Sequence, residues 1–390
     1  MDSSNFLQKQ HLQPNWVLTV GVLFLLSAIT ACQGNDQSQN SSDNPQQKAT
    51  NIESQLILNN ATLEQSNAKG EMLWKIQVDE AVYSPDRKKA QLTAVKGNIF
   101  QDGKIVLRIK ADQGEIDRDG QEIYLKENIV AVDPRNDAVI QSEEVEWRPR
   151  ESVLMIRKNL RGSHPQFTAS AKEGKYYATQ QKLEFIGNII ATSKKPRMQL
   201  KTEHLLWKIP EQKVIGDRLL NIVRFQDKIV TDKLVANRAE VHLNTKQIIV
   251  KDNIEFKSIK PPVQVATNEF IWKYEVRQVT SSRPVKLIHY QQGVIVTGNQ
   301  AEVDLTNSIA YLRGGVQGNS TANAAKLYSN DLTWNVDTQI IEALGNVIYE
   351  QTNPDFNLTG EKAVGTIHDN KIVVSGNAQD RVVTEFFPNK

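Results

Sequence analysis

The sequence predicts a nearly all-β protein of 390 residues, built from antiparallel strands behind an N-terminal membrane anchor. From residue 51 onward, apolar and polar residues alternate in short runs, as at Leu332, Trp334 and Val336 in DLTWNVD. This period of two is typical of strands that bury one face. Turn-forming sequences such as DRDG, LNTK, LTNS and HDNK separate the runs. No long stretch of apolar residues at helical spacing follows residue 51, so we expect a succession of hairpins in a nearly all-β domain.

The anchor is predicted within residues 1–32. The run from Trp16 to Ala31 contains no charged residue, follows Lys9, and is marginally short for a spanning helix, which needs about 17 to 25 residues. Ile29-Thr30-Ala31-Cys32 resembles a lipobox, and Cys32 is the only cysteine of the chain. Two alternatives stay open: a signal peptide cleaved to leave a lipid on Cys32, or an uncleaved helix.

Residues 33–50 form a polar tract without large apolar side chains, which predicts a disordered tether. Residues 51–390 then form the folded domain, which a single cysteine leaves without disulfides. The net charge of +2, from 47 basic and 45 acidic residues, argues against a nucleic-acid partner.

The folded domain repeats internally. Five segments, starting at Gly114, Gly174, Ala239, Ala301 and Ala363, align without a gap. Each reaches a Gly-Asn-like pair 13 residues later, and a looser second series alternates with the first; together they give a period of about 31 residues and about ten such half-repeats. The anchors of the first series are Glu127, Gly187, Asp252, Gly314 and Gly376, and those of the second are Gly97-Asn98, Asn159, Gly216-Asp217 and Gly345-Asn346.

The Gly-Asn pairs are interpreted as turns or bulges that need a positive φ, rather than as ligand contacts. Five tryptophans recur at the double period, and we expect them to fill the core: Trp74, Trp147, Trp207, Trp272 and Trp334.

The phrases AVKGNIF, FIGNIIATS and EALGNVIYEQ, each followed by an alternating strand, together with the short anchor, resemble the LptC family of periplasmic lipopolysaccharide-export proteins. LptA and the N-terminal part of LptD, the OstA-like group, are relatives of that family. The resemblance covers roughly Ile52 to Val383, and the length of the chain fits a long, cyanobacterial-type member. It implies an elongated antiparallel β-jellyroll, or β-taco, in which two sheets face each other across an apolar groove.

The resemblance also implies a function. In the family, the groove carries the acyl chains of lipopolysaccharide from the inner toward the outer membrane. An inner-membrane ABC transporter drives the lipid, and strand pairing at sheet edges joins each domain to the next, including a periplasmic LptA-like protein. We therefore expect a periplasmic protein anchored at the inner membrane, with a docking edge near the C-terminal run Val382 to Phe387.

Alternation along the strands supplies candidates for the groove, and it leaves open which of them line a groove and which fill a closed core. The candidates are Leu183, Phe185, Ile189, Ile248, Val250, Ile254, Trp334, Val336, Ile341 and Val347.

No enzyme, cofactor or metal site is expected. The chain has no GxSxG, HExxH or phosphate-loop motif, and its six histidines are scattered singly. Two alternatives stay open: an exported parallel β-helix that binds or cleaves a polysaccharide, and a structural envelope lipoprotein. Cleavage would need paired carboxylates. The acidic pairs Asp79-Glu80 and Glu143-Glu144 sit in charge-mixed segments that are typical of a solvated face.

Overall fold

The structure, a computed structural model, describes residues 55–66, 70–101, 103–117, 122–134, 137–148, 151, 153–163, 165, 167–177, 180, 182–194, 197–208, 210–321, 324–352, 355–366, 372–376 and 381–386. Within these ranges the secondary structure consists of 28 strands without a helix. The predicted anchor, Cys32 and the tether lie outside the described residues.

The first half of the domain contains β1 (Leu56–Ser66), β2 (Met72–Tyr83), β3 (Ala90–Gln101), β4 (Lys104–Asp117), β5 (Glu122–Asp133), β6 (Ala138–Arg148), β7 (Val153–Arg157), β8 (Leu160–Ser163), β9 (Phe167–Ala171), β10 (Glu173–Tyr177), β11 (Lys182–Lys194), β12 (Arg197–Lys208), β13 (Lys213–Gly216) and β14 (Leu220–Gln226).

The second half contains β15 (Ile229–Ala236), β16 (Arg238–His242), β17 (Gln247–Ser258), β18 (Val263–Lys273), β19 (Gln278–Ser281), β20 (Val285–His289), β21 (Val294–Gly298), β22 (Gln300–Asp304), β23 (Ile309–Ser320), β24 (Ala325–Asn335), β25 (Ile340–Thr352), β26 (Asp355–Thr366), β27 (Ile372–Ser375) and β28 (Val383–Phe386).

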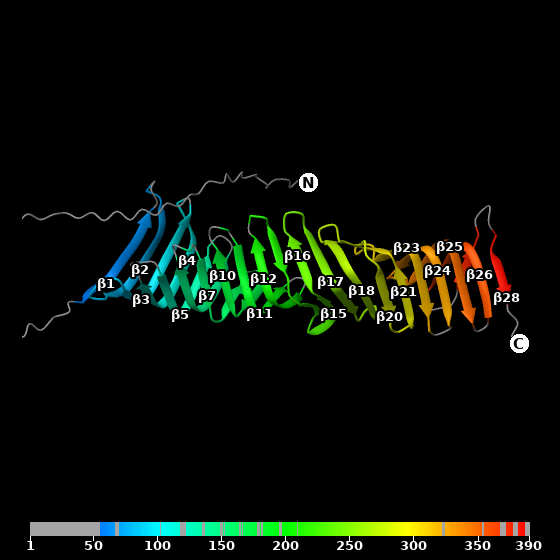
Figure 1. Cartoon of the computed structure of the whole chain (residues 1–390), viewed down its shortest axis with the longest axis horizontal. Helices are drawn as coiled ribbons and strands as arrows, with labels where there is room; N and C mark the ends of the chain where they lie inside the picture. Colours follow the sequence, from blue (N-terminus) through cyan, green and yellow to red (C-terminus); the bar gives the residue numbers. More distant parts are fainter. Residues whose placement is uncertain are drawn as a thin grey trace, which may run out of the picture. The chain divides into compact units, whose positions relative to one another are not determined.

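The strands form one antiparallel sheet from β1 to β28 (Figure 1), in which the long strands pair with their neighbours in the chain and some short strands pair across two intervening ones, as β7 does with β10. Long strands pair with their neighbours almost from end to end, as between Ala90↔Ile116 and Gln101↔Lys104 in β3 and β4. The all-β antiparallel prediction is confirmed. The parallel β-helix alternative is wrong, because every pairing between described strands is antiparallel.

The sheet is folded lengthwise. Each pass of the chain, meaning the segment from one hairpin turn to the next, bends near its middle. In the long strands the bend is a β-bulge, at which two residues of one strand lie opposite one residue of the next, as between Ile186 and Ile189 of β11 and between Lys251 and Ile254 of β17. In other passes the chain breaks into two short strands, as at Asn237 between β15 and β16. The resemblance implied two facing sheets; the structure instead has one continuous sheet with two halves.

The two halves are named by their short strands. The first half-sheet contains β7, β10, β13, β16, β19, β22 and β27, and the second contains β8, β9, β14, β15, β20, β21 and β28. The long strands cross both halves.

The predicted positive-φ bulges are found at most of the sequence anchors. Glu127, Gly187, Asp252 and Gly314 have φ values of 63°, 75°, 64° and 80°. In the second series, Asn159 and the pair Gly345-Asn346 also have positive φ, at 58°, 76° and 50°. Each lies at the bend, where an extra residue must be accommodated without breaking the ladder. Gly376 directly follows β27 at the end of a described segment.

Two anchors of the second series have a different role. Near Gly97 the positive φ belongs to Ala94, and Gly216 is paired within β13. A Cβ at Gly216 would lie 2.9 Å from Leu220 Cδ2, and one at Gly97 would lie 3.0 Å from Ile109 Cγ2. These glycines are therefore needed for close packing, a requirement that has the same sequence signature as a turn.

The core follows the bend. The largest fully buried side chains are five valines, of which the last three lie beside a bulge: Val78, Val95, Val250, Val316 and Val347. Around them, side chains of the two half-sheets pack against each other, as Leu312 and Trp334 do with Val263, Val285 and Val296.

The hairpin turns at the ends of the passes form two edges, here named the first and second lip. The first lip includes Leu243–Lys246 and Leu305–Ser308, and the second includes residues 259–262 and 290–293. Backbone hydrogen bonds connect successive turns along each lip, as from Tyr290 N to Pro262 O at 3.0 Å and from Val336 N to Ser308 O at 2.9 Å.

Candidate functional site

The interior of the first half-sheet carries a continuous row of directly paired, mainly apolar side chains. Directly opposed residues on neighbouring strands project from the same face, so an unbroken series of such pairs stays on one face. We name this series the lip row, because its members lie farther from the bend than the buried residues beside the bulges. Ile248, for example, lies two residues farther from the bend than Val250. Its members are Ile123, Trp147, Leu154, Tyr176, Leu183, Trp207, Val214, Val241, Ile248, Trp272, Val279, Val303, Ala310, Trp334 and Ile341.

The structure divides the candidate groove residues into two sets. The fully buried set is Ile189, Val250, Ile254, Trp334 and Val347, of which all but Trp334 lie beside a bulge. The half-buried set is Leu183, Phe185, Ile248, Val336 and Ile341. Burial therefore assigns the bulge-side candidates to a packed core, and Phe185, Ile248, Val336 and Ile341 of the half-buried set pack at its margin.

Four of the five tryptophans of the repeat lie on one row, whereas Trp74 pairs with Ile99 at the other end of β2 and β3. Trp147, Trp207, Trp272 and Trp334 are all in the lip row, and four pairing steps separate each from the next. Trp334 is 6% exposed and belongs to a core cluster, as expected for a core filler. Its ring also meets His289 of the second half-sheet edge-on, at 6.1 Å between centroids.

A hollow of about 870 Å³ lies where the two lips approach each other. Ile259, Pro262 and Tyr290 line it from the second lip, and Val336 and Gln339 line it from the first. Val336 also packs against the core cluster that contains Trp334. The hollow therefore connects the surface to the half-buried part of the interior.

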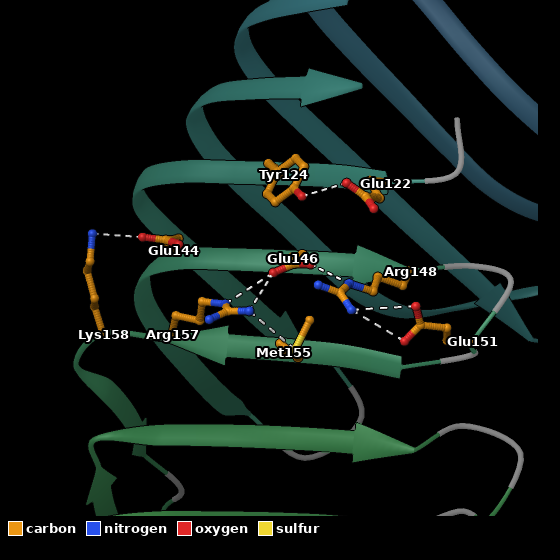
Figure 2. Close-up of polar contacts among 9 residues, drawn as sticks. All are labelled: Glu122, Tyr124, Glu144, Glu146, Arg148, Glu151, Met155, Arg157 and Lys158. Carbon is orange, nitrogen blue, oxygen red and sulfur yellow. Dashed lines mark hydrogen bonds and ion pairs between the residues drawn. The ribbon is translucent and has the colours of Figure 1, made fainter. Parts of the chain in front are cut away.

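The outer face of the first half-sheet carries acidic side chains held by cations, which the sequence reasoning missed. Glu146 is 3% exposed, and its carboxylate accepts hydrogen bonds from Arg148 Nε and from Arg157 Nη2 at 2.8 Å (Figure 2). Next to it, a hydrogen bond to Glu122 is the main cause that raises the pKa of Tyr124 to about 12.

Similar acids recur on this face along the sheet. Lys213 Nζ lies 2.6 Å from Glu240, and its hydrogen bond lowers the pKa of that carboxyl. Arg313 likewise lowers the pKa of Glu302 across 2.8 Å. The signal that could have revealed them is a glutamate at an outward alternate position in successive repeats. These clusters neutralise charge on the outside of the sheet and leave the interior apolar.

His204 lies between two carboxylates on the same outer face. Its Nδ1 is 2.7 Å from Asp217 Oδ1 and its Nε2 is 3.0 Å from Glu184 Oε1. Burial lowers the pKa of His204, but the hydrogen bonds to Asp217 and Glu184 outweigh it, so the pKa lies above its ordinary value. The two carboxylates therefore favour the protonated form of the imidazole.

The structure shows the partners of one of the two acidic pairs singled out in the sequence, Glu143-Glu144. Each of these two carboxylates is bound to a different side chain. Glu143 accepts a hydrogen bond from Asn159 Nδ2 at 2.9 Å, and Glu144 pairs with Lys158 at 2.8 Å. In the part of the chain that the structure describes, no group of three or more histidine, cysteine or acidic residues is arranged to hold a metal ion. Nor does any helix there have the length and apolarity needed to cross a membrane.

The described strands thus define an all-β protein whose single folded antiparallel sheet has a mainly apolar inner row and charged pairs on its outer face. The chain matches the family described as "Lipopolysaccharide-assembly, LptC-related" over residues 21–155 and 219–322. It belongs to this family, as the resemblance indicated, and is therefore a protein of lipopolysaccharide transport rather than one of a known enzyme family.

Among solved structures, the chain is similar to LptH of Pseudomonas aeruginosa, the LptA-homologous periplasmic component of the lipopolysaccharide transport device. The identity is 11%, the TM-score is 0.21, and the match covers 40% of this chain and 95% of that one. No curated protein matches the chain.

Proposed function

We propose that the domain receives lipopolysaccharide from an inner-membrane ABC transporter and passes it along its interior to a periplasmic LptA-like protein. The observation that carries the proposal is the lip row, a half-buried and mainly apolar surface continuous over directly paired strands from β5 to β25. Each CH₂ group kept from water there is worth about 0.8 kcal/mol. A lipid can therefore move along this surface without exposing its chains to water.

Anchoring of the domain is part of the proposal. An N-terminal helix or a lipid on Cys32 would hold it at the inner membrane, close to the transporter that supplies the lipid. Mass spectrometry of the mature N-terminus distinguishes the two anchors.

The open ends of the sheet support the second half of the proposal. Among the described strands, β1 pairs only with β2, and β27 and β28 pair only with β26. Exposed apolar side chains lie at both ends, including Ile57 at 48% and Val373 at 68%. A partner sheet can add a strand to such an edge.

A photocrosslinking amino acid at Ile341 tests the transport proposal. Ile341 is half-buried in the lip row, whereas its neighbour Ile340 is 42% exposed, so the same probe at Ile340 is a matched control. We expect capture of lipopolysaccharide in cells from position 341 and much less from position 340. Equal capture from the two positions, or none from either, contradicts the proposal and favours a structural envelope protein.

A further inference from the structure

Three tryptophans of the lip row have buried indole N–H groups without a hydrogen-bond partner. They are Trp207, Trp272 and Trp334. A buried indole N–H normally finds an acceptor, and each exception in a folded protein needs an explanation. The same unpaired donor recurs at one place in three successive repeats, which points to a shared role rather than to a local packing defect.

The surroundings of the three indoles supply no acceptor side chain across the strands. The direct partners are Leu183 and Val214 for Trp207, Ile248 and Val279 for Trp272, and Ala310 and Ile341 for Trp334. All of them are aliphatic. None of these directly opposed side chains can accept a hydrogen bond, and a molecule that enters the interior can supply the acceptor.

The apolar neighbours also restrict the chemistry of this acceptor. A phosphate or carboxylate beside these indoles would lose its hydration without gaining a cation, at a high cost in free energy. A neutral carbonyl oxygen attached to a hydrocarbon chain fits both the donor and its neighbours. Acyl ester and acyl amide groups have this structure, and they lie at the headgroup end of a lipid chain.

The indoles lie at a depth between the lips and the bend that suits the headgroup end of an acyl chain. The lip row lies nearer the lips than the buried positions beside the bulges. A chain that points toward the bend would thus bring its carbonyl to the level of the indoles.

We propose that the indole N–H groups of Trp207, Trp272 and Trp334 bind the acyl carbonyl oxygens of the transported lipid, at stations four strands apart. This inference rests on the proposed transport function and adds substrate selectivity to it. At about 4.8 Å per strand, the stations are about 19 Å apart along the sheet. The lipid would be held where a carbonyl oxygen accepts a hydrogen bond from an indole, and it would move freely between two such stations.

The test compares two lipids that differ only in the carbonyl. The probes are a diacyl ester phospholipid and the dialkyl ether phospholipid with the same headgroup and chain lengths, each presented to the purified chain. We expect the native chain to bind the ester about fivefold more tightly, as one added hydrogen bond predicts. A variant with Trp207→Phe, Trp272→Phe and Trp334→Phe keeps three aromatic rings, loses the three donors and should bind both lipids equally.

The outcomes separate this inference from the function on which it rests. Equal binding of the two lipids by the native chain, or an ester preference retained by the triple variant, overturns the carbonyl stations while leaving transport intact. Binding of neither lipid also overturns the carbonyl stations, and the crosslinking comparison of positions 341 and 340 decides the transport function separately. If the triple variant does not fold, the comparison on the native chain decides.

A second readout is independent of the variant's stability. In ¹⁵N-tryptophan spectra, the three indole N–H resonances should move downfield with the ester lipid and stay in place with the ether lipid. Trp147 is the internal reference, since it lies on the same row and its indole nitrogen is not among the buried unpartnered atoms. Equal shifts with both lipids would contradict the inference.

Discussion

At the scale of single residues, distance from the bend decides what an apolar side chain does. Ile254, beside the bulge of β17, is 3% exposed, whereas the half-buried Ile248 on the same strand belongs to the lip row. Both have the alternation of an inward-facing residue. Packing at the bend makes the first a core residue, whereas the second lies half-buried at the margin of the core.

The role of Ile254 can be measured directly. Ile254→Ala should lower the free energy of unfolding by about 2–5 kcal/mol, because it removes buried surface and leaves a cavity. Ile229→Ala is the matched control, since Ile229 is 68% exposed, and it should change the free energy by less than about 0.5 kcal/mol. Urea unfolding followed by circular dichroism measures both. Equal effects would show that the bend is not the stabilising core.

His204 predicts a pH dependence of stability. Its folded-state pKa is raised above the ordinary value of 6.5 by the pairs with Asp217 and Glu184, which outweigh burial. Protonated His204 therefore stabilises the fold fully below the unfolded-state pKa, and this contribution is lost as pH rises through the folded-state pKa. The difference in melting temperature between the native chain and His204→Gln should be largest below the unfolded-state pKa and should disappear as pH rises through the raised folded-state pKa. A difference that grows with pH would refute the assignment.

At the scale of elements, each pass of the chain combines two constraints. Its alternation turns apolar residues inward in both half-sheets, and its two-residue bulge keeps that alternation in phase across the bend. The paired φ values at Asp252 and Asn253, 64° and 53°, show how a strand continues after bending. Asn and Asp tolerate this conformation better than other non-glycine residues, which explains the repeated Gly-Asn-like pairs.

The outer pairing of β6 and β7 gives an element-scale prediction. Glu146→Ala removes the buried acceptor shared by Arg148 and Arg157 and should cost about 1–3 kcal/mol. Glu151→Ala also removes a partner of Arg148, but Glu151 is largely exposed, so we expect less than about 1 kcal/mol. Hydrogen exchange of the β6 and β7 amides locates the effect. Similar protection of these amides from exchange in the two variants would mean that Glu146 does not stabilise the pairing of β6 with β7.

At the scale of the whole molecule, the sheet is a ladder in which each pass contacts its neighbours in the chain. Such arrays gain stability mainly from nearest-neighbour interfaces and lose little when a terminal unit is removed. The two end strands are then available to other proteins. An edge strand that is unpaired in the isolated chain can pair with a strand of another protein in an assembly.

Truncation at the C-terminal edge tests whether a partner protein pairs with this edge. Deleting residues 367–390 removes β27 and β28 and should abolish crosslinking to the LptA-like partner while the remaining passes stay folded. A cut at Ala363 is unsuitable, since Ala363 is 2% exposed within β26 and pairs with Ala343. Removing residues 387–390 alone is the control and should leave crosslinking unchanged. Undiminished crosslinking after the longer deletion would place the partner elsewhere.

The prediction from sequence succeeded where the signal is local. Alternation, turns and the bulges at Gly187 and Asp252 depend on neighbouring residues, and all are confirmed. It went wrong at Gly97 and Gly216, where glycine is required by side chains from distant strands rather than by its own φ. The outer acids such as Glu146 were missed because their partners become neighbours only through strand register.

The sequence by itself determined the antiparallel strands, their period and the face that each side chain takes, because alternation and turn chemistry act over a few residues. Tertiary structure alone decided that one sheet folds on itself, which candidates are buried at the bend, and that Trp207, Trp272 and Trp334 share one row. Those properties depend on register and on packing between half-sheets, which join residues many strands apart.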